Sequence, residues 1–321
     1  MNYRQFGNAG FEVSEIGFGA WGIGGTPKDA KAYGPTDDEE SKRALIKAYD
    51  LGITFFDTSP LYGYGHSECL IGKALKNVRD KIVIASKAGF LNFKGDQDFS
   101  TFAIRKSVEE SLQRLQTDYI DILQLHYPPI ELIETDHSVF ETLTSLKEEG
   151  KIRLIGISMP SPTDALRVLE LYPFKSIQAN FSLIDQRALD QGLFDICSKK
   201  KVGMIGRTPL CFGFLTGHYS ADDVYDSSDH RSNWSKKQVE CWVNAFQLFS
   251  DDLIKNENQS NAQIALRFCL SYSEVSTIIP GMLTEAHVEE NAKSSQLGKL
   301  DYSILEHFNM IYHNNEFIVR S

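Results

Sequence analysis

Four side chains that can carry protons or charge follow short apolar runs of the chain: Asp57, Tyr62, Lys87 and His126. A carboxylate, a phenol, an ammonium and an imidazole are groups from which sites for general acid–base catalysis are built. Apolar runs of this length are typical of parallel strands, and in a closed barrel the strand ends converge on one mouth. Residues spread over about seventy positions can therefore meet, and the sequence predicts a proton-transfer site.

Each of the four residues also has an ordinary structural interpretation. An Asp at a strand end can cap the next helix, and a Tyr beside a Gly can be a turn aromatic. Lys87 can be a solvated end charge, and His126 a buried histidine with its hydrogen bonds satisfied. For any one residue alone the structural interpretation is favoured, but their joint occurrence at successive strand ends favours the functional one.

The elements that must position these side chains alternate between strand-like and helix-like segments from about residue 16 to residue 295. Continuous apolar and β-branched runs predict eight strands, at 16–21, 53–57, 82–87, 120–126, 154–158, 176–180, 202–206 and 277–280. Capping patterns predict helix starts at Thr36–Glu39, Ser161–Pro162 and Ser260–Gln263.

Eight such units predict an α/β fold of the (β/α)₈ TIM barrel class, with residues 1–321 as a single domain. Residues 1–14 are expected to form an N-terminal β-hairpin that plugs the far end of the barrel, and an extra helix is expected before residue 314. Gly17, Gly19 and Gly22 spell GxGxxG, but no helix starts before about Thr36. A Rossmann fold is therefore not favoured, because its phosphate site needs a helix N-terminus there.

The composition narrows the range of partners and compartments. Of 321 residues, 42% are hydrophobic, and the formal net charge of −10 disfavours nucleic acid and anionic membrane surfaces. No run approaches the roughly 18 to 20 apolar residues of a membrane span, and the start lacks an apolar signal segment, so we expect a cytoplasmic protein. Five widely spaced cysteines without a CxxC pair are expected to be reduced thiols.

Several ordered motifs cover nearly the whole chain. They are DTSPLYG at 57–63, GHSE at 65–68, SKAG at 86–89, LQLHYP at 123–128, GIS at 156–158, GFLTG at 213–217 and IPG at 279–281. In this order and on these elements, the chain resembles the aldo-keto reductase family.

The resemblance implies a barrel enzyme that moves a hydride between a nicotinamide and a carbonyl or alcohol, without a metal. Tyr62 would be the general acid/base, with Asp57, Lys87 and His126 around it. A nearby ammonium would lower the pKa of this phenol by two or three units, at roughly 3 to 4 kcal/mol of phenolate stabilisation. The alternatives are a nicotinamide-binding sensor or channel-associated subunit with little turnover, and a lyase or isomerase on the common barrel.

The resemblance also implies which residues hold the ligands. For the cofactor these are Gly19, Ala20, Trp21, Asp57, Ser158, Gln178, Arg207, Pro209, Leu210, Gly213, Leu215, Gly217, Pro280, Gly281, His287, Glu290 and Asn291. For a small carbonyl or sugar substrate they are Trp21, Tyr62, Phe90, His126 and Tyr127, with Tyr33 and Phe93 as further candidate walls.

Two positions and one segment depart from the family pattern. Met159 stands where the family usually has Asn, and Arg207 stands where many members place a ring-stacking Tyr. The segment 280–287 lacks the Lys and Arg that many members direct at the 2′-phosphate of NADP. NADP (NADPH) is favoured on family habit alone, and NAD is possible.

A polar segment, residues 219–237, interrupts the barrel pattern after the seventh strand. A segment of this length and composition is either a lid over the site or a disordered surface loop. Both interpretations remain open at this point.

Overall fold

The structure is a computed structural model that describes residues 1–249 and 259–318. Its strands are β1 (Tyr3–Gln5), β2 (Glu12–Ser14), β3 (Phe18–Gly19), β4 (Phe55–Asp57), β5 (Val83–Ala88), β6 (Ile120–His126), β7 (Ile152–Ser158), β8 (Ser176–Asn180), β9 (Gly203–Arg207) and β10 (Val275–Ile278). Its α-helices are α1 (Asp38–Asp50), α2 (His66–Leu75), α3 (Thr101–Leu115), α4 (Ile130–Thr135), α5 (His137–Glu148), α6 (Pro162–Leu171), α7 (Arg187–Asp190), α8 (Leu193–Lys200), α9 (Lys236–Phe249), α11 (Asn261–Leu270), α12 (Glu285–Leu297) and α13 (Tyr302–His313). Short 3₁₀ turns are η1 (Gly22–Gly24), η2 (Lys76–Lys81), η3 (Cys211–Thr216) and η4 (His230–Asn233).

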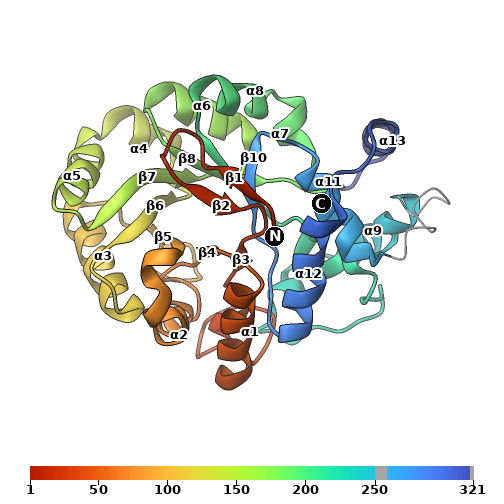
Figure 1. Ribbon diagram of the computed structural model, residues 1–321, viewed down its shortest axis with the longest axis horizontal. Helices are drawn as coiled ribbons and strands as arrows, with labels where there is room; N and C mark the ends of the chain where they lie inside the picture. The colour runs from red at the N-terminus through yellow and green to blue at the C-terminus, as the bar shows by residue number, and fades with distance from the viewer. Residues whose placement is uncertain (250–258, 319–321) are drawn as a thin grey trace.

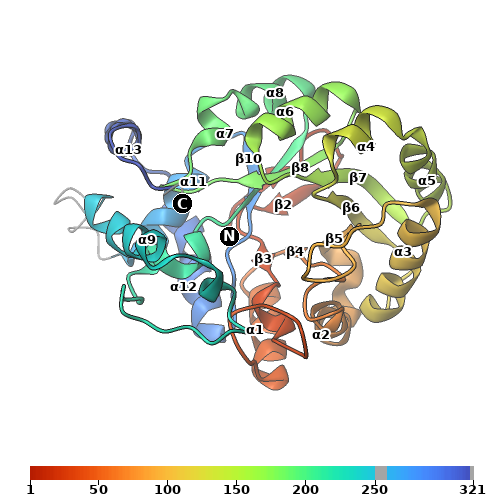
Figure 2. The same cartoon turned by 180° about the vertical axis from the view of Figure 1, so that it is seen from behind.

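Strands β3 to β10 form one parallel sheet in chain order. Parallel bridges join Ile16 to Ile278 and Gly19 to Gly281, so the last strand lies beside the first. The backbone N–H of Gly17 donates to the carbonyl of Ile278 at 2.7 Å across this junction. Helices surround the strands, as the two opposite views show (Figures 1 and 2). The (β/α)₈ TIM barrel predicted from the sequence is confirmed.

The barrel strands begin and end within two residues of the predicted bounds. Ser161 caps α6 with Pro162 in its first turn, and Ser260 and Gln263 form the predicted capping box of α11. The predicted cap of α1 is wrong by one residue, because Asp37 and not Thr36 accepts a hydrogen bond, from the N–H of Glu40. The three-residue spacing of Thr36 and Glu39 recurs one residue later in Asp37 and Glu40. A carboxylate is also a stronger acceptor than a hydroxyl at the positive end of a helix.

The N-terminal hairpin closes the end of the barrel where the strands begin. Strands β1 and β2 pair antiparallel (Figure 1). The guanidinium of Arg4 donates to the carbonyl of Val275, the first residue of β10, at 2.8 Å. Phe6 is fully buried and stacks on Phe55 inside the barrel, with ring centroids 6.0 Å apart. The opposite end, where the strands finish, is thereby left as the place for a site.

The predicted extra helix near the C-terminus is α13, which packs through Phe308 onto Phe249 of α9 with ring centroids 5.4 Å apart. The five cysteines are unpaired. Within 1–249 and 259–318, no helix combines the length and apolar composition needed to cross a bilayer.

Candidate active site

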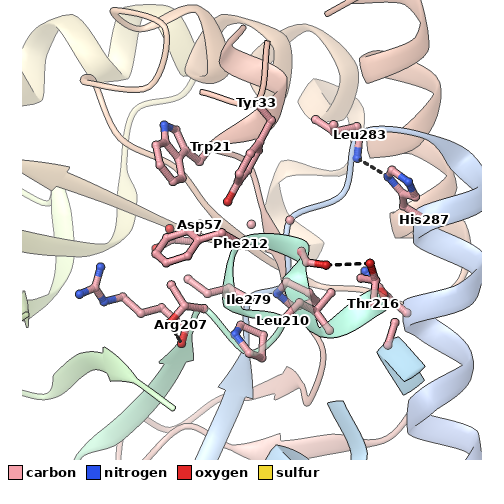
Figure 3. A pocket seen from close by; sticks show the side chains of 18 of the residues that line it. Trp21, Tyr33, Asp57, Arg207, Leu210, Phe212, Thr216, Ile279, Leu283 and His287 are labelled. Atoms are coloured by element: carbon pink, nitrogen blue, oxygen red, sulfur yellow. Dashed lines mark hydrogen bonds between the residues drawn. The ribbon is translucent and has the colours of Figure 1, made fainter. Parts of the chain in front are cut away.

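A pocket of about 300 Å³ lies at the mouth where the barrel strands end. Residues from β3, β4, β8, β9, the segment after β10 and helix α12 contribute to its wall (Figure 3). Most of the residues predicted from the sequence line it: Gly19, Trp21, Asp57, Tyr62, Gln178, Arg207, Pro209, Leu210, Gly213, Pro280, Gly281, His287, Glu290 and Asn291. Of the further candidate walls, Tyr33 lines the pocket.

Other predicted residues do not form the pocket surface. Ala20 and Leu215 are fully buried, because the main chain turns their side chains into the core. Gly217 ends the turn η3 with φ +78° and approaches Asn261. Ser158 is buried behind Gln178. Lys87, Phe90, Phe93, His126 and Tyr127 also lie outside the lining.

Asp57, which lines the pocket, forms a buried ion pair with Lys87, which lies outside the lining. Asp57 ends β4, Lys87 lies on the adjacent β5, and their side chains are 2% and 1% exposed. The ammonium of Lys87 donates to Oδ2 of Asp57 at 2.6 Å and to the carbonyl of Thr58 at 2.9 Å. Burial lowers the pKa of Lys87, while the charge of Asp57 acts in the opposite direction. The pair is held by mutual attraction in a dry environment.

Two amides complete the hydrogen bonding of Asp57. Gln178 of β8 donates to Oδ1 of Asp57 at 2.7 Å, and Gln124 of β6 donates to the same oxygen at 3.2 Å. The carbonyl of Gln178 accepts from the hydroxyl of Ser158 at 3.0 Å. Donors that converge on one carboxylate favour its charged form. The contact from Gln124 was not predicted, because a Gln within an apolar strand gives no sign of where its amide is directed.

Tyr62 is presented by a tight turn after β4. Its N–H donates to the carbonyl of Ser59 at 3.0 Å, and the next residue, Gly63, has φ +59°. A Cβ on Gly63 would lie 2.1 Å from the carbonyl oxygen of Gly24, so only glycine fits between these two backbones. This close approach sets the direction in which the phenol enters the pocket.

The prediction that Lys87 makes Tyr62 acidic is wrong for this structure. The ammonium of Lys87 lies over the face of the phenol ring, 4.8 Å from its centroid, and its charge is matched by Asp57. Burial raises the pKa of Tyr62 well above its usual value, Asp57 raises it further, and Arg207 lowers it. Tyr62 therefore carries its proton at neutral pH.

His126 ends β6 within an aromatic cluster beside the pocket. Its ring packs edge-on against Phe90 and Tyr127, at centroid distances of 4.8 and 4.7 Å. Burial lowers the pKa of His126 well below its usual value, and the positive charges of Lys87 and Arg207 lower it further. His126 is therefore neutral at physiological pH, with one ring N–H to donate.

If His126 takes part in the carbonyl reduction that the family resemblance implies, the rate of that reaction should be flat between about pH 5.5 and 8, since an ordinary histidine titrates near 6.5. The reason is its lowered pKa, which keeps the imidazole neutral through this range. The measurement is kcat against pH for a good aldehyde, with His126→Gln as the control. An inflection near pH 6.5 that disappears in the control would contradict the neutral assignment.

Arg207 ends β9 and reaches into the same site (Figure 3). Its guanidinium lies 4.7 Å from the ring centroid of Tyr127. Burial lowers the pKa of Arg207 to about 10, so the group stays charged at neutral pH. Its Nε is buried and lacks a hydrogen-bond partner in the described part of the chain. A buried donor without a partner is costly, and a polar ligand in the pocket would relieve that cost.

Residues 219–234, which we call the strap, pack against the pocket. Tyr219 and Arg231 line it. The backbone N–H of His230 donates to the carbonyl of Ala32 at 2.7 Å, which joins the strap to the loop after β3. Arg231 pairs with Asp229 at 2.6 Å, and both side chains are 8% exposed. Of the two interpretations left open for residues 219–237, a covering segment agrees with these contacts.

Among the lining residues, sequence reasoning missed His218, Tyr219, Arg231, Ala262 and Ile279. Arg231 lies 4.5 Å and 4.8 Å from the ring centroids of Tyr219 and Tyr225. Aromatic residues spaced within a polar, Asp-rich segment were the available signal, because a disordered segment is usually poor in aromatics.

The sequence matches the model of the Aldo/keto reductase family over residues 15–311. It is 35% identical over 302 residues to L-galactose dehydrogenase of Arabidopsis thaliana, covering 91% of this chain and 87% of the plant protein. It is 29% identical to the NADH-specific methylglyoxal reductase of Escherichia coli, covering 94% of this chain and 95% of that protein. It is also 29% identical to an NADP(+) aldo-keto reductase of Schizosaccharomyces pombe, covering 94% of this chain and 89% of that protein.

Among solved structures, glycerol dehydrogenase from Gluconobacter oxydans is similar, with a TM-score of 0.80 and 27% identity. The similarity covers 99% of this chain and 97% of that chain. Relatives thus include proteins named for NADP(+) and for NADH, so kinship alone does not decide between the two cofactors.

Proposed function

Because this chain belongs to the aldo/keto reductase family of NAD(P)-dependent oxidoreductases, we propose that it transfers a hydride between a nicotinamide cofactor and the carbonyl or alcohol group of a small aldehyde, ketone or sugar. The observation that carries this proposal is the buried Asp57–Lys87 pair beside Tyr62, of which Asp57 and Tyr62 line the pocket.

The lining suits a dinucleotide. The unpartnered Nε of Arg207 and the amide of Gln178 can meet polar groups at the strand ends, where the nicotinamide would lie. Backbone around the turn η3 can donate to phosphate oxygens, and Asn291 of α12 can contact the adenosine. When bound, the nicotinamide supplies the hydride, and the protein contributes position and charge.

The chain's own residues would supply the proton. In reduction, the hydroxyl of Tyr62 donates to the carbonyl oxygen as negative charge develops there. The neutral imidazole of His126 donates a second hydrogen bond that orients the carbonyl. Asp57 fixes Lys87 in place, and the positive charge of Arg207 favours the phenolate that remains.

The lining favours a small, hydroxylated substrate. Trp21, Tyr33 and Phe212 provide flat apolar walls, while His218 and Thr216 add polar groups. Relatives named for L-galactose, methylglyoxal and glycerol agree with a substrate of this size. We propose a short aldehyde or a sugar.

The test is turnover by the purified protein, followed by the absorbance of reduced nicotinamide. Methylglyoxal and other short aldehydes are tested with NADH and with NADPH, and L-galactose and glycerol with the oxidised cofactors. Turnover with any of them supports the proposal. Cofactor binding without turnover across the whole panel would favour the sensor or channel-associated alternative, and absence of binding would exclude both.

A further inference from the structure

We propose that Arg207 makes the pocket select short oxo acids, that is, aldehydes or ketones with a carboxylate within a few bonds of the carbonyl group. This inference rests on the proposed function, which places the reacting carbonyl beside Tyr62. Arg207 lines the pocket, as Tyr62 does. Figure 3 shows Trp21 and Arg207 on one side of the pocket and His287 on the opposite side. The end of the pocket proposed for the substrate therefore holds a guanidinium.

Arg207 differs from every other arginine that the structure describes. The others pair with carboxylates or, in the case of Arg267, donate to backbone carbonyls. Within residues 1–249 and 259–318, the guanidinium of Arg207 has neither an ion pair nor a hydrogen bond, and its Nε is buried. Its neighbour is the uncharged ring of Tyr127, whose centroid lies 4.7 Å from the guanidinium carbon. A buried charged donor without a partner is costly, so this group is arranged for an anion that arrives with a ligand.

The carboxylates of the pocket do not neutralise Arg207. Of the described residues that line the pocket, Asp57 and Glu290 are acidic. Asp57 is matched by Lys87 at 2.6 Å, so that pair is neutral as a whole. Glu290 lies on α12, the helix that carries His287 on the opposite side of the pocket (Figure 3). One positive charge is therefore left over beside the place proposed for the carbonyl, in a protein whose formal net charge is −10.

A nicotinamide at the same place would not supply the missing negative charge. Its amide is neutral, and its ring is neutral when reduced and positive when oxidised. Under the proposed function, the phosphates of the cofactor lie at the turn η3. The anion that pairs with Arg207 is therefore a group of the substrate.

The position of Arg207 limits how far this anion lies from the carbonyl. The ring of Tyr127, which the guanidinium contacts, packs against the ring of His126 with centroids 4.7 Å apart. The charge of Arg207 lowers the pKa of His126 and opposes the rise in the pKa of Tyr62. The guanidinium thus acts on both groups that would meet the carbonyl oxygen, so a carboxylate bound to it is a few bonds from that oxygen.

A carboxylate suits this guanidinium. The guanidinium is planar, and its forked N–H donors match the two oxygens of a carboxylate in a bidentate pair. A hydroxyl or an acetyl group of similar size offers one acceptor and no charge. The selection therefore depends on a charge at one position of a small molecule, and not on its overall size.

The first measurement is binding to the full chain loaded with NADH or NADPH. Oxamate carries a carboxylate and no carbonyl that hydride reduces, and oxamide is its neutral counterpart of the same size. We expect Kd for oxamate to be at least tenfold lower than Kd for oxamide, from the change in fluorescence of the bound cofactor. Equal affinities would overturn the inference. Failure of both reduced cofactors to bind would overturn the proposed function itself.

The second measurement compares the turnover of glyoxylate with that of methylglyoxal, in which an acetyl group replaces the carboxylate. In Arg207→Met, kcat/KM should fall for both substrates, because the charge that favours the phenolate of Tyr62 is lost. It should fall about 10- to 100-fold further for glyoxylate, the range for one hydrogen-bonded pair with a charged group. Arg207→Lys keeps the charge without the fork, and should lose less of the preference for glyoxylate than Arg207→Met.

The matched control is Arg167→Met, which removes an arginine that is 49% exposed on α6 and lies outside the lining. It should keep the parent values for both substrates. An equal fall for both substrates in Arg207→Met, with or without a raised Kd for the reduced cofactor, would assign Arg207 to Tyr62 or to the cofactor and overturn the inference. Preferred binding of oxamate without turnover of either substrate would count against the proposed function and leave the carboxylate site in place.

Discussion

Replacing Tyr62 with Phe should lower kcat for carbonyl reduction by about 10²- to 10⁴-fold, the usual contribution of a positioned general acid. The ring remains and only the hydroxyl is lost, so the packing beside Trp21 and under the ammonium of Lys87 is preserved. Kd for the reduced cofactor should change little. Steady-state turnover with a good aldehyde and fluorescence titration give the two quantities.

The matched control is Tyr64→Phe, two residues later in the same turn. Tyr64 is 41% exposed and donates only to the carbonyl of Asp29, at 3.3 Å. Its turnover should match that of the parent protein. A Tyr62→Phe protein with near-parent kcat, unchanged thermal stability and normal cofactor binding would exclude Tyr62 as the acid.

Replacing Lys87 with Met should lower the free energy of unfolding by about 3 to 5 kcal/mol, the range for breaking a buried ion pair on one side. The carboxylate of Asp57 would remain buried, with two amide donors and no cation. Denaturant unfolding measures this loss. Turnover should fall as well, because the charge of Asp57, which raises the pKa of Tyr62, would no longer be matched by Lys87.

Two further variants test whether burial of the ion pair causes the loss of stability in Lys87→Met. Asp57→Asn combined with Lys87→Met removes both charges, and should recover most of the stability while remaining inactive. Lys236→Met breaks an exposed pair with Asp222 and should cost less than about 0.5 kcal/mol. Equal losses in Lys236→Met and Lys87→Met would show that burial of the pair is not what matters.

The barrel could be predicted from the sequence because each strand is a continuous apolar run, and a parallel sheet covered by helices requires that pattern. The meeting of Asp57 with Lys87 followed directly, since adjacent parallel strands end at the same mouth. Likewise the capping box at Ser260 was predictable, because it depends on two residues at a fixed spacing.

What escaped prediction depends on neighbours distant in the sequence. The strap is placed by pairing between Ala32 and Asp229, which no periodic pattern encodes. The direction in which the pKa of Tyr62 shifts depends on burial by several elements. The motifs that bring Tyr62 and Lys87 together had predicted a lowered pKa instead.

The first and last strands of the barrel meet at Gly19 and Gly281, and these residues, with Pro280, also line the pocket. A dinucleotide bound there would contact both the first and the last strand of the barrel, and would link the two strands across their junction. The binding free energy would stabilise the folded barrel at this junction, so the melting temperature should rise with ligand concentration. The amide protons of Gly17 and Gly19 form hydrogen bonds across this junction, and they should exchange more slowly in the complex.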